Sequence, residues 1–67
     1  MISILVNGEA EQVPAPCSVA ALLAARGLAG KRVAVERNGA IVPRSRHDHV
    51  ELTNDDRLEI VVAVGGG

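Results

Sequence analysis

The chain has 67 residues, a hydrophobic fraction of 48% and a formal net charge of −1, with seven basic and eight acidic residues. This length allows one domain with one modest core, and the composition is typical of a folded chain. Phe, Tyr and Trp are absent and the basic residues form no stripe, so the composition argues against a nucleic-acid-binding surface.

The N-terminal segment predicts a β-hairpin. Ile2 to Val6 is rich in β-branched residues and ends at Asn7-Gly8, the strongest short signal for a hairpin turn. The return strand is then expected over Ala10 to Val13. Pro14 and Pro16 end it, because neither has an N–H to donate to a strand ladder.

The next segment predicts one short amphipathic helix, from Val19 to Arg26. Ser18 is a good N-cap, since its hydroxyl can accept a hydrogen bond from a free backbone N–H of the first turn. The helical spacing i, i+3, i+4 places three apolar residues on one face: Val19, Leu22 and Leu23. Gly27 suits the left-handed position after the helix, with Leu28 packing just beyond it.

Two further strands and an irregular loop are expected in the middle of the chain. Val33 to Arg37 reads as a strand that ends at a second Asn-Gly turn, Asn38-Gly39. Ile41 and Val42 form a short strand ended by Pro43. Arg44 to Asn54 is polar, so we expect a solvated irregular loop with at most one helical turn.

The last strand is predicted from Arg57 to Val64, after a turn at Asp55-Asp56. Because side chains alternate along a strand, one set should face the helix and the other should face outward. The inward set comprises Leu58, Ile60 and Val62, together with Ile2, Ile4 and Val6 of the first strand. The outward set comprises Glu59, Val61 and Ala63.

This order of elements predicts an α+β fold of the β-grasp (ubiquitin-like) type. One helix would lie across one face of a mixed sheet of four or five strands, with the first and last strands as parallel neighbours in its middle. We expect residues 1–64 to form this domain and residues 65–67 to form a flexible C-terminal glycine tail.

The three glycines Gly65, Gly66 and Gly67 admit two interpretations. Glycine has no side chain to pack and loses the most backbone entropy on ordering, so a frayed end without function is the simpler one. Alternatively, a tail without Cβ atoms can thread a narrow enzyme channel. Its terminal carboxylate is ionised at neutral pH and can attack the α-phosphorus of ATP.

Four segments together resemble the ThiS family, the sulfur carriers of thiamin biosynthesis, over essentially the whole chain. The segments are Asn7-Gly8, the Ser18-capped helix, Asn38-Gly39-Ala40-Ile41-Val42-Pro43-Arg44, and Leu58-Glu59-Ile60-Val61 with the glycine ending. One departure is Arg37, where an apolar residue is expected, so its side chain should lie at a strand end and reach water.

The resemblance implies a carrier and not an enzyme, with Gly67 as sulfur acceptor and Gly65 and Gly66 threading partner active sites. A ThiF-type, E1-like enzyme would use ATP to adenylate Gly67. Sulfur from a persulfide, such as that of a cysteine desulfurase, would then give a thiocarboxylate for the thiazole synthase ThiG. No permanently bound cofactor is implied.

The outward face of the sheet predicts a docking site for a partner enzyme. Leu5, Val61 and Ala63 are expected to lie exposed on neighbouring strands with no second layer above them. An exposed apolar patch beside the tail is suited to bind the ThiF-type enzyme.

Other conspicuous residues have simpler structural interpretations. His47-Asp48-His49 lacks a third strong ligand nearby, so a solvated loop is favoured over a metal site. Cys17 precedes the helix, where a thiol's pKa can fall, but a packing role is favoured over a persulfide carrier. Lys31 is the only lysine, so polymer formation through side-chain amines is not expected to be the main role.

Cellular location is expected to be the cytoplasm, without a membrane partner. Cys17 is the only cysteine, which fits a reducing compartment. The N-terminus shows no features of a secretory signal, and the longest apolar stretch, Val19 to Ala25, is too short to span a bilayer.

Two alternatives remain open at this point. One is a carrier with the same chemistry, of the MoaD type that serves molybdopterin synthase. The other is a β-grasp binding module of the TGS kind, in which the tail has no chemistry.

Overall fold

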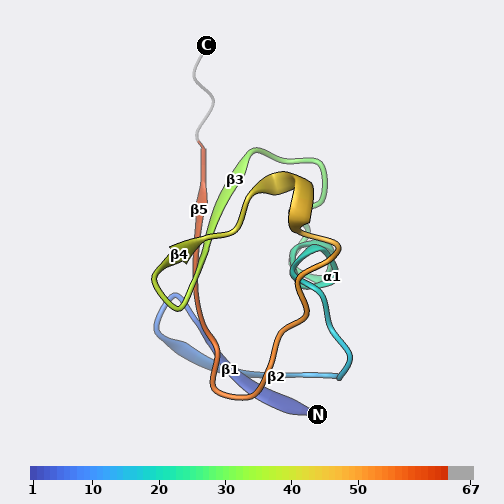
Figure 1. Ribbon diagram of the computed structural model, residues 1–67, viewed down its shortest axis with the longest axis vertical. Helices are drawn as coiled ribbons and strands as arrows, with labels where there is room; N and C mark the ends of the chain where they lie inside the picture. The colour runs from blue at the N-terminus through green and yellow to red at the C-terminus, as the bar shows by residue number, and fades with distance from the viewer. Residues whose placement is uncertain (64–67) are drawn as a thin grey trace.

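The computed structural model describes residues 1–63, which form a five-stranded mixed sheet and one α-helix (Figure 1). The elements are β1 (Ile2–Val6), β2 (Glu9–Val13), α1 (Val19–Ala25), β3 (Val33–Arg37), β4 (Ala40–Ile41), the 3₁₀ turn η1 (Arg44–Arg46) and β5 (Arg57–Val62). Val64, the glycine tail and the predictions made for them lie outside the described residues.

The strand order β2-β1-β5-β3-β4 places the first and last strands side by side in the middle of the sheet. β1 and β5 run parallel, whereas β1–β2, β3–β4 and β3–β5 are antiparallel. Helix α1 lies on one side of this sheet (Figure 1). The predicted β-grasp arrangement is therefore confirmed.

Strand boundaries differ from the sequence prediction at three places. β2 begins at Glu9 because it pairs directly with Val6 after the tight Asn-Gly turn. β4 spans Ala40–Ile41 rather than Ile41 and Val42. β5 ends at Val62, so the strand predicted to continue through Ala63 is too long, although the Ala63 N–H still donates to the Arg32 carbonyl at 2.9 Å.

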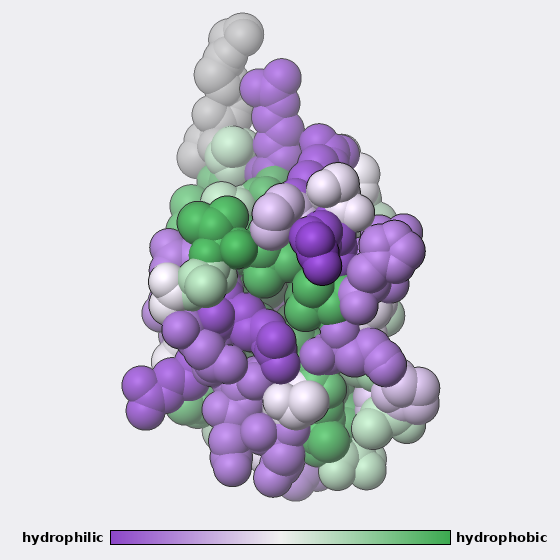
Figure 2. All heavy atoms as spheres, viewed as in Figure 1, coloured by the Kyte–Doolittle hydropathy of each residue, from purple (hydrophilic) through white to green (hydrophobic). Residues whose placement is uncertain are grey.

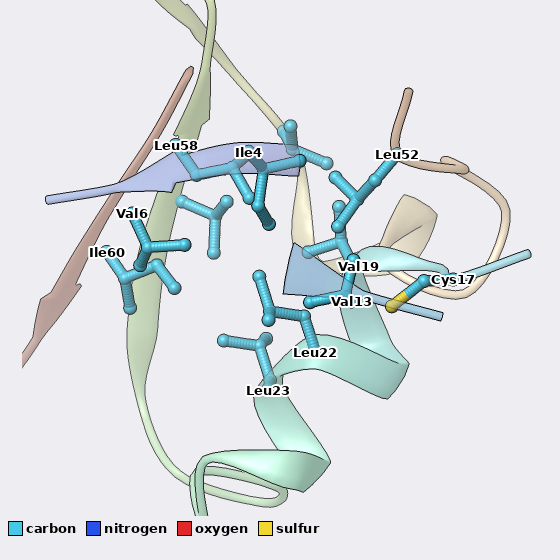
Figure 3. Packing of buried hydrophobic residues seen from close by; sticks show 12 residues of the cluster. Ile4, Val6, Val13, Cys17, Val19, Leu22, Leu23, Leu52, Leu58 and Ile60 are labelled. Carbon is cyan, nitrogen blue, oxygen red and sulfur yellow. The ribbon is translucent and has the colours of Figure 1, made fainter. Parts of the chain in front are cut away.

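The core fills the space between α1 and the facing side of the sheet. In Figure 3 the side chains of Ile4, Val6, Leu58 and Ile60 point from the strands toward the leucines of α1. The buried apolar set comprises Ile4, Val6, Val13, Cys17, Val19, Leu22, Leu23, Val35, Val42, Leu52, Leu58 and Ile60. Burying a large aliphatic side chain contributes about 1.5–3 kcal/mol, so the eleven valine, leucine and isoleucine residues of this set supply the main driving force for folding.

Val62 corrects the expectation that the whole inward set of β5 lies beneath the helix. It shares a face with Leu58 and Ile60, yet it is 44% exposed. The helix has only seven residues and is therefore about 10 Å long, so it covers only a few rungs of the sheet. Val62 pairs with half-buried Val33 beyond that cover.

Both ends of α1 carry the predicted caps. The Ser18 Oγ accepts a hydrogen bond from the Ala21 N–H at 3.0 Å. At the other end the Gly27 N–H donates to Ala24 and the Leu28 N–H donates to Leu23, the two bonds of a Schellman motif. Gly27 has φ +75°, the left-handed conformation that glycine adopts without a Cβ penalty.

The loop after η1 also stabilises the helix N-terminus, which corrects the prediction that it is simply solvated. The Val19 and Ala20 N–H groups donate to the carbonyls of Val50 and His47, at 3.0 and 2.8 Å. These are donors that a helix cannot satisfy itself. His47 is buried, and its Nε2 lies 3.2 Å from the Val42 carbonyl oxygen.

Asp56 is a buried carboxylate that joins the end of β3 and the turn after it to the loop ahead of β5. Its Oδ2 accepts from the Arg37 Nε and the Thr53 N–H, both at 2.8 Å. Its Oδ1 accepts from the Asn38 Nδ2 and the Thr53 Oγ1, both at 3.1 Å. Arg37 therefore binds Asp56 while keeping its side chain partly exposed, as expected for a charged residue at a strand end.

Burial by itself raises the pKa of Asp56, but the hydrogen bonds from Arg37, Thr53 and Asn38 outweigh it and hold the pKa below its ordinary value. The ionised form therefore stabilises the fold.

No helix within residues 1–63 is long and apolar enough to cross a membrane.

We predict that Asp56→Asn lowers the free energy of unfolding at neutral pH by about 1–3 kcal/mol, because buried donors lose a charged acceptor. The carboxylate's stabilisation is present above its unfolded-state pKa of about 3.9 and is lost as the pH falls through the lower folded-state pKa. The difference between wild type and variant should therefore shrink below about pH 4.

Urea denaturation across this pH range measures that difference. Asp48→Asn, at an exposed position, is the matched control and should have little effect at any pH. An Asp56→Asn penalty that stays constant from neutral to acidic pH would contradict the assignment.

Candidate functional site

The candidate site is the end of β5, the strand that precedes the three glycines in the sequence. β5 lies between β1 and β3, so neighbours can hold it along both edges. Its exposed residues Arg57, Glu59 and Val61 face away from α1, whereas Val62 is exposed on the helix side beyond the cover of α1. The site is therefore built from what fixes β5 and from what its outer face presents.

Asn7 of the first hairpin turn binds β5 through its side chain. Backbone pairing of β1 with β5 reaches Val6 opposite Leu58, and the Asn7 N–H then donates to the Leu58 carbonyl at 2.9 Å. The Asn7 Oδ1 accepts from the Ile60 N–H at 2.8 Å, and its Nδ2 donates to the Ile60 carbonyl at 3.2 Å. The Asn7 side-chain amide thus bonds to Ile60 in the way that the backbone of one further β1 residue would.

Asn38 of the second hairpin turn has a matching role at the start of β5. Its backbone N–H donates to the Arg57 carbonyl at 2.8 Å, and its Oδ1 accepts from the Arg57 N–H at 2.9 Å. Asn7 and Asn38 have φ values of +51° and +53°, a conformation that asparagine tolerates better than most residues. Both turns therefore fix β5 in addition to reversing the chain.

The predicted docking patch is divided by the structure. Val61 is 63% exposed and Ala63 is exposed two residues further along the same face. Leu5 is half-buried and lies opposite Arg57, four residues from Val61 along β5, or about 13 Å at strand spacing. Leu5 therefore does not join the exposed apolar group near the end of β5.

Ala34 takes the place that Leu5 was expected to fill, because it pairs directly with Val61 across β3 and β5 and is exposed. The sequence signal for Ala34 was its position one residue after Val33, which faces inward. Figure 2 shows a largely hydrophilic side of the molecule, on which hydrophobic side chains gather over β4 and the segment that follows it.

Cys17 is buried and packs within the core, as favoured from the sequence. Burial raises the pKa of the Cys17 thiol, and the nearby Glu11 carboxylate raises it further. A protonated, inaccessible thiol is a poor nucleophile. Cys17 is therefore unsuited to accept sulfur.

The remaining predicted residues are placed as follows. Across residues 1–63, no group of three or more His, Cys, Asp or Glu side chains could hold a metal ion. His47 is buried against Val42, whereas His49 is exposed. Gly65, Gly66 and Gly67 lie outside the described residues, so their roles stay predictions.

Comparisons with known proteins agree on one family. A model of the ThiS family matches residues 4–67. A sulfur carrier protein ThiS of Bacillus subtilis is 50% identical over 46 residues, covering 69% of this chain and 70% of that protein. A crystal structure of a thiamine biosynthesis protein (ThiS) from Geobacter metallireducens matches with a TM-score of 0.81 and 30% identity, over 98% of this chain and 100% of that one.

A larger relative shares the same segment. A thiazole synthase of Paramagnetospirillum magneticum is 42% identical over 66 residues, which are 98% of this chain. The chain spans only 20% of that synthase's length. A segment of this kind therefore occurs within a much longer protein.

We predict that Asn7→Gly destabilises the fold by about 1–3 kcal/mol, because the two hydrogen bonds between the Asn7 side-chain amide and the Ile60 backbone are lost. Glycine tolerates the positive φ at this turn, so backbone strain does not contribute. Native-state hydrogen exchange should quicken at the Ile60 N–H more than at Glu59, which pairs with Glu36 on the other edge of β5. Equal acceleration at both amides would mean that the Asn7 amide has no local role.

Proposed function

The chain belongs to the ThiS family, and on that premise we propose that it is a sulfur carrier for thiamin biosynthesis, with the cargo held on the carboxylate of Gly67. The observation that carries this proposal is a single family match that spans both the β-grasp domain and the three glycines. The chain then acts as a carrier and not as an enzyme. We place its reactions in the cytoplasm.

The proposed loading reaction has three covalent steps. A carboxylate oxygen of Gly67 attacks the α-phosphorus of ATP and pyrophosphate leaves, which activates the acyl group as an adenylate. The terminal sulfur of a protein persulfide then attacks the acyl carbon and AMP leaves, giving an acyl disulfide. A thiol cleaves the S–S bond by exchange and leaves a thiocarboxylate on Gly67.

The proposed partners follow from these steps. A ThiF-type, E1-like enzyme binds ATP and adenylates Gly67, and a cysteine desulfurase supplies the persulfide. ATP is thus consumed on the partner, and no resident cofactor is needed on the carrier. A ThiG-type thiazole synthase takes up the sulfur. The shared segment in the thiazole synthase of Paramagnetospirillum magneticum supports this last partner.

The proposed docking surface for the ThiF-type enzyme is the outer face near the end of β5. Val61 and Ala63 from β5 and its extension, with Ala34 from β3, present exposed apolar side chains there. Exposed apolar groups in one place are typical of protein interaction sites. Leu5 is left out because it lies opposite Arg57, at the start of β5 and four residues from Val61.

We predict that incubation with a ThiF-type enzyme, ATP and a persulfide donor replaces one oxygen of the Gly67 carboxylate by sulfur, as seen by intact-protein mass spectrometry. Deletion of Gly67 should abolish this change, because the new terminal carboxylate, on Gly66, ends one residue short of the partner's reactive position. Residues fused after Gly67 should abolish it too, because they convert its carboxylate into an amide. Cys17→Ala should load like wild type, since the buried thiol takes no part.

Two results would overturn the proposed function. One is sulfur on a chain that lacks Gly67. The other is a wild-type chain that gains no sulfur under conditions in which the Bacillus subtilis carrier does, which would favour a β-grasp binding module without tail chemistry.

We predict that Val61→Asp raises the KM of the carrier in the adenylation reaction by roughly tenfold, because a charge on the docking surface must be desolvated on binding. The fold should keep its thermal stability, since the side chain is 63% exposed. Ala21→Asp introduces the same charge at an exposed position of α1 and should leave KM near that of wild type. Equal KM values for the two variants would exclude this face as the docking site.

A further inference from the structure

Three side chains lie side by side across strands β4, β3 and β5, on the face of the sheet that α1 does not cover. Ile41 of β4 pairs with Glu36 of β3, and Glu36 pairs with Glu59 of β5. Directly paired residues in an antiparallel ladder point to the same side, with Cβ atoms about 4.5–5.5 Å apart. Two carboxylates therefore stand next to each other on the face that α1 does not cover.

This arrangement is unfavourable for the isolated domain, because like charges directly opposite each other in a sheet repel. The ion pairs formed by residues 1–63 are Arg26–Glu11 and Arg37–Asp56, so neither involves this carboxylate pair. Arg57 lines the same shallow hollow as Glu36 and Glu59, but it lies within ion-pair distance of neither. Among the residues that line this hollow, two are negatively charged and one is positively charged.

Apolar side chains surround the two carboxylates on the same face, so the excess negative charge lies within an apolar surface. The next rung on the same face is Ala34 opposite Val61, and Ile41, 64% exposed, flanks the pair on its other side. An exposed apolar surface with two unneutralised carboxylates at its centre is complementary to a partner that brings a cation among apolar side chains. Docking there would remove the repulsion and bury the apolar groups together.

From this complementarity, and resting on the proposed function, we infer that Glu36 and Glu59 together receive an arginine side chain of the ThiF-type activating enzyme when the carrier docks. A guanidinium has several donors in one plane and can bind two carboxylates at once. It is also weakly hydrated, so it can lie against Val61 and Ile41 at lower cost than an ammonium. The acid pair would thus select the partner and fix its orientation.

Adenylation kinetics with a ThiF-type enzyme test this inference. Glu36→Gln, Glu59→Gln and the double variant keep the shape of the surface and remove its charge. The double variant should raise KM by roughly three- to tenfold with kcat unchanged, because a docking contact outside the reacting atoms is lost. Its KM should also depend less on salt concentration than that of wild type.

Stability measurements separate this effect from misfolding. Removing the repulsion should leave the urea midpoint of the double variant equal to or above that of wild type. Glu51→Gln, at an exposed position away from β3 and β5, is the matched control and should keep the wild-type KM and salt dependence. Weaker docking together with an undiminished midpoint therefore supports the inference.

The inference is overturned if the double variant is adenylated with the KM and salt dependence of wild type. That result would leave the carrier function intact. An enzyme that adenylates none of the forms, wild type included, while it activates the Bacillus subtilis carrier would instead overturn the proposed function itself.

Discussion

The structure depends on how β5 is held at the centre of the sheet. Its two edges are bonded differently: β3 supplies a five-residue antiparallel register, whereas β1 supplies only two paired residues. The shortfall on the β1 side is made up by the side-chain amide of Asn7, which bonds both backbone groups of Ile60. Asn38 and Asp56 fix the start of the strand. These contacts set the direction of β5 up to Val62.

The short helix divides the sheet into surfaces of different kinds. Seven helical residues are enough to cover the central inward side chains, but they leave Val62 exposed at one end. The opposite face has no covering layer among residues 1–63, so Val61, Ala34 and the Glu36–Glu59 pair are available to a partner. Under the proposed function, one face of the sheet serves stability and the other serves recognition of a partner.

Local patterns predicted the elements well, because each depends on residues close in sequence. Asn-Gly turns, the Ser18 cap and the Gly27 ending all act within one turn of chain and appear where expected. Contacts between distant segments were not predictable in the same way. Periodicity does not show that Asn7 reaches Ile60 or that the loop carbonyl of His47 accepts from Ala20. The separation of Leu5 from Val61 depends on the strand register, which alternation alone does not fix.

Under the proposed function, in which a persulfide donates the sulfur, the position of Cys17 has a consequence. Proteins that relay sulfur through thiols are exposed to disulfide exchange with every partner they meet. Here the single thiol of the chain is enclosed by the core and kept protonated. In the proposed reaction the Cys17 thiol therefore does not compete with the Gly67 carboxylate as an acceptor of sulfur.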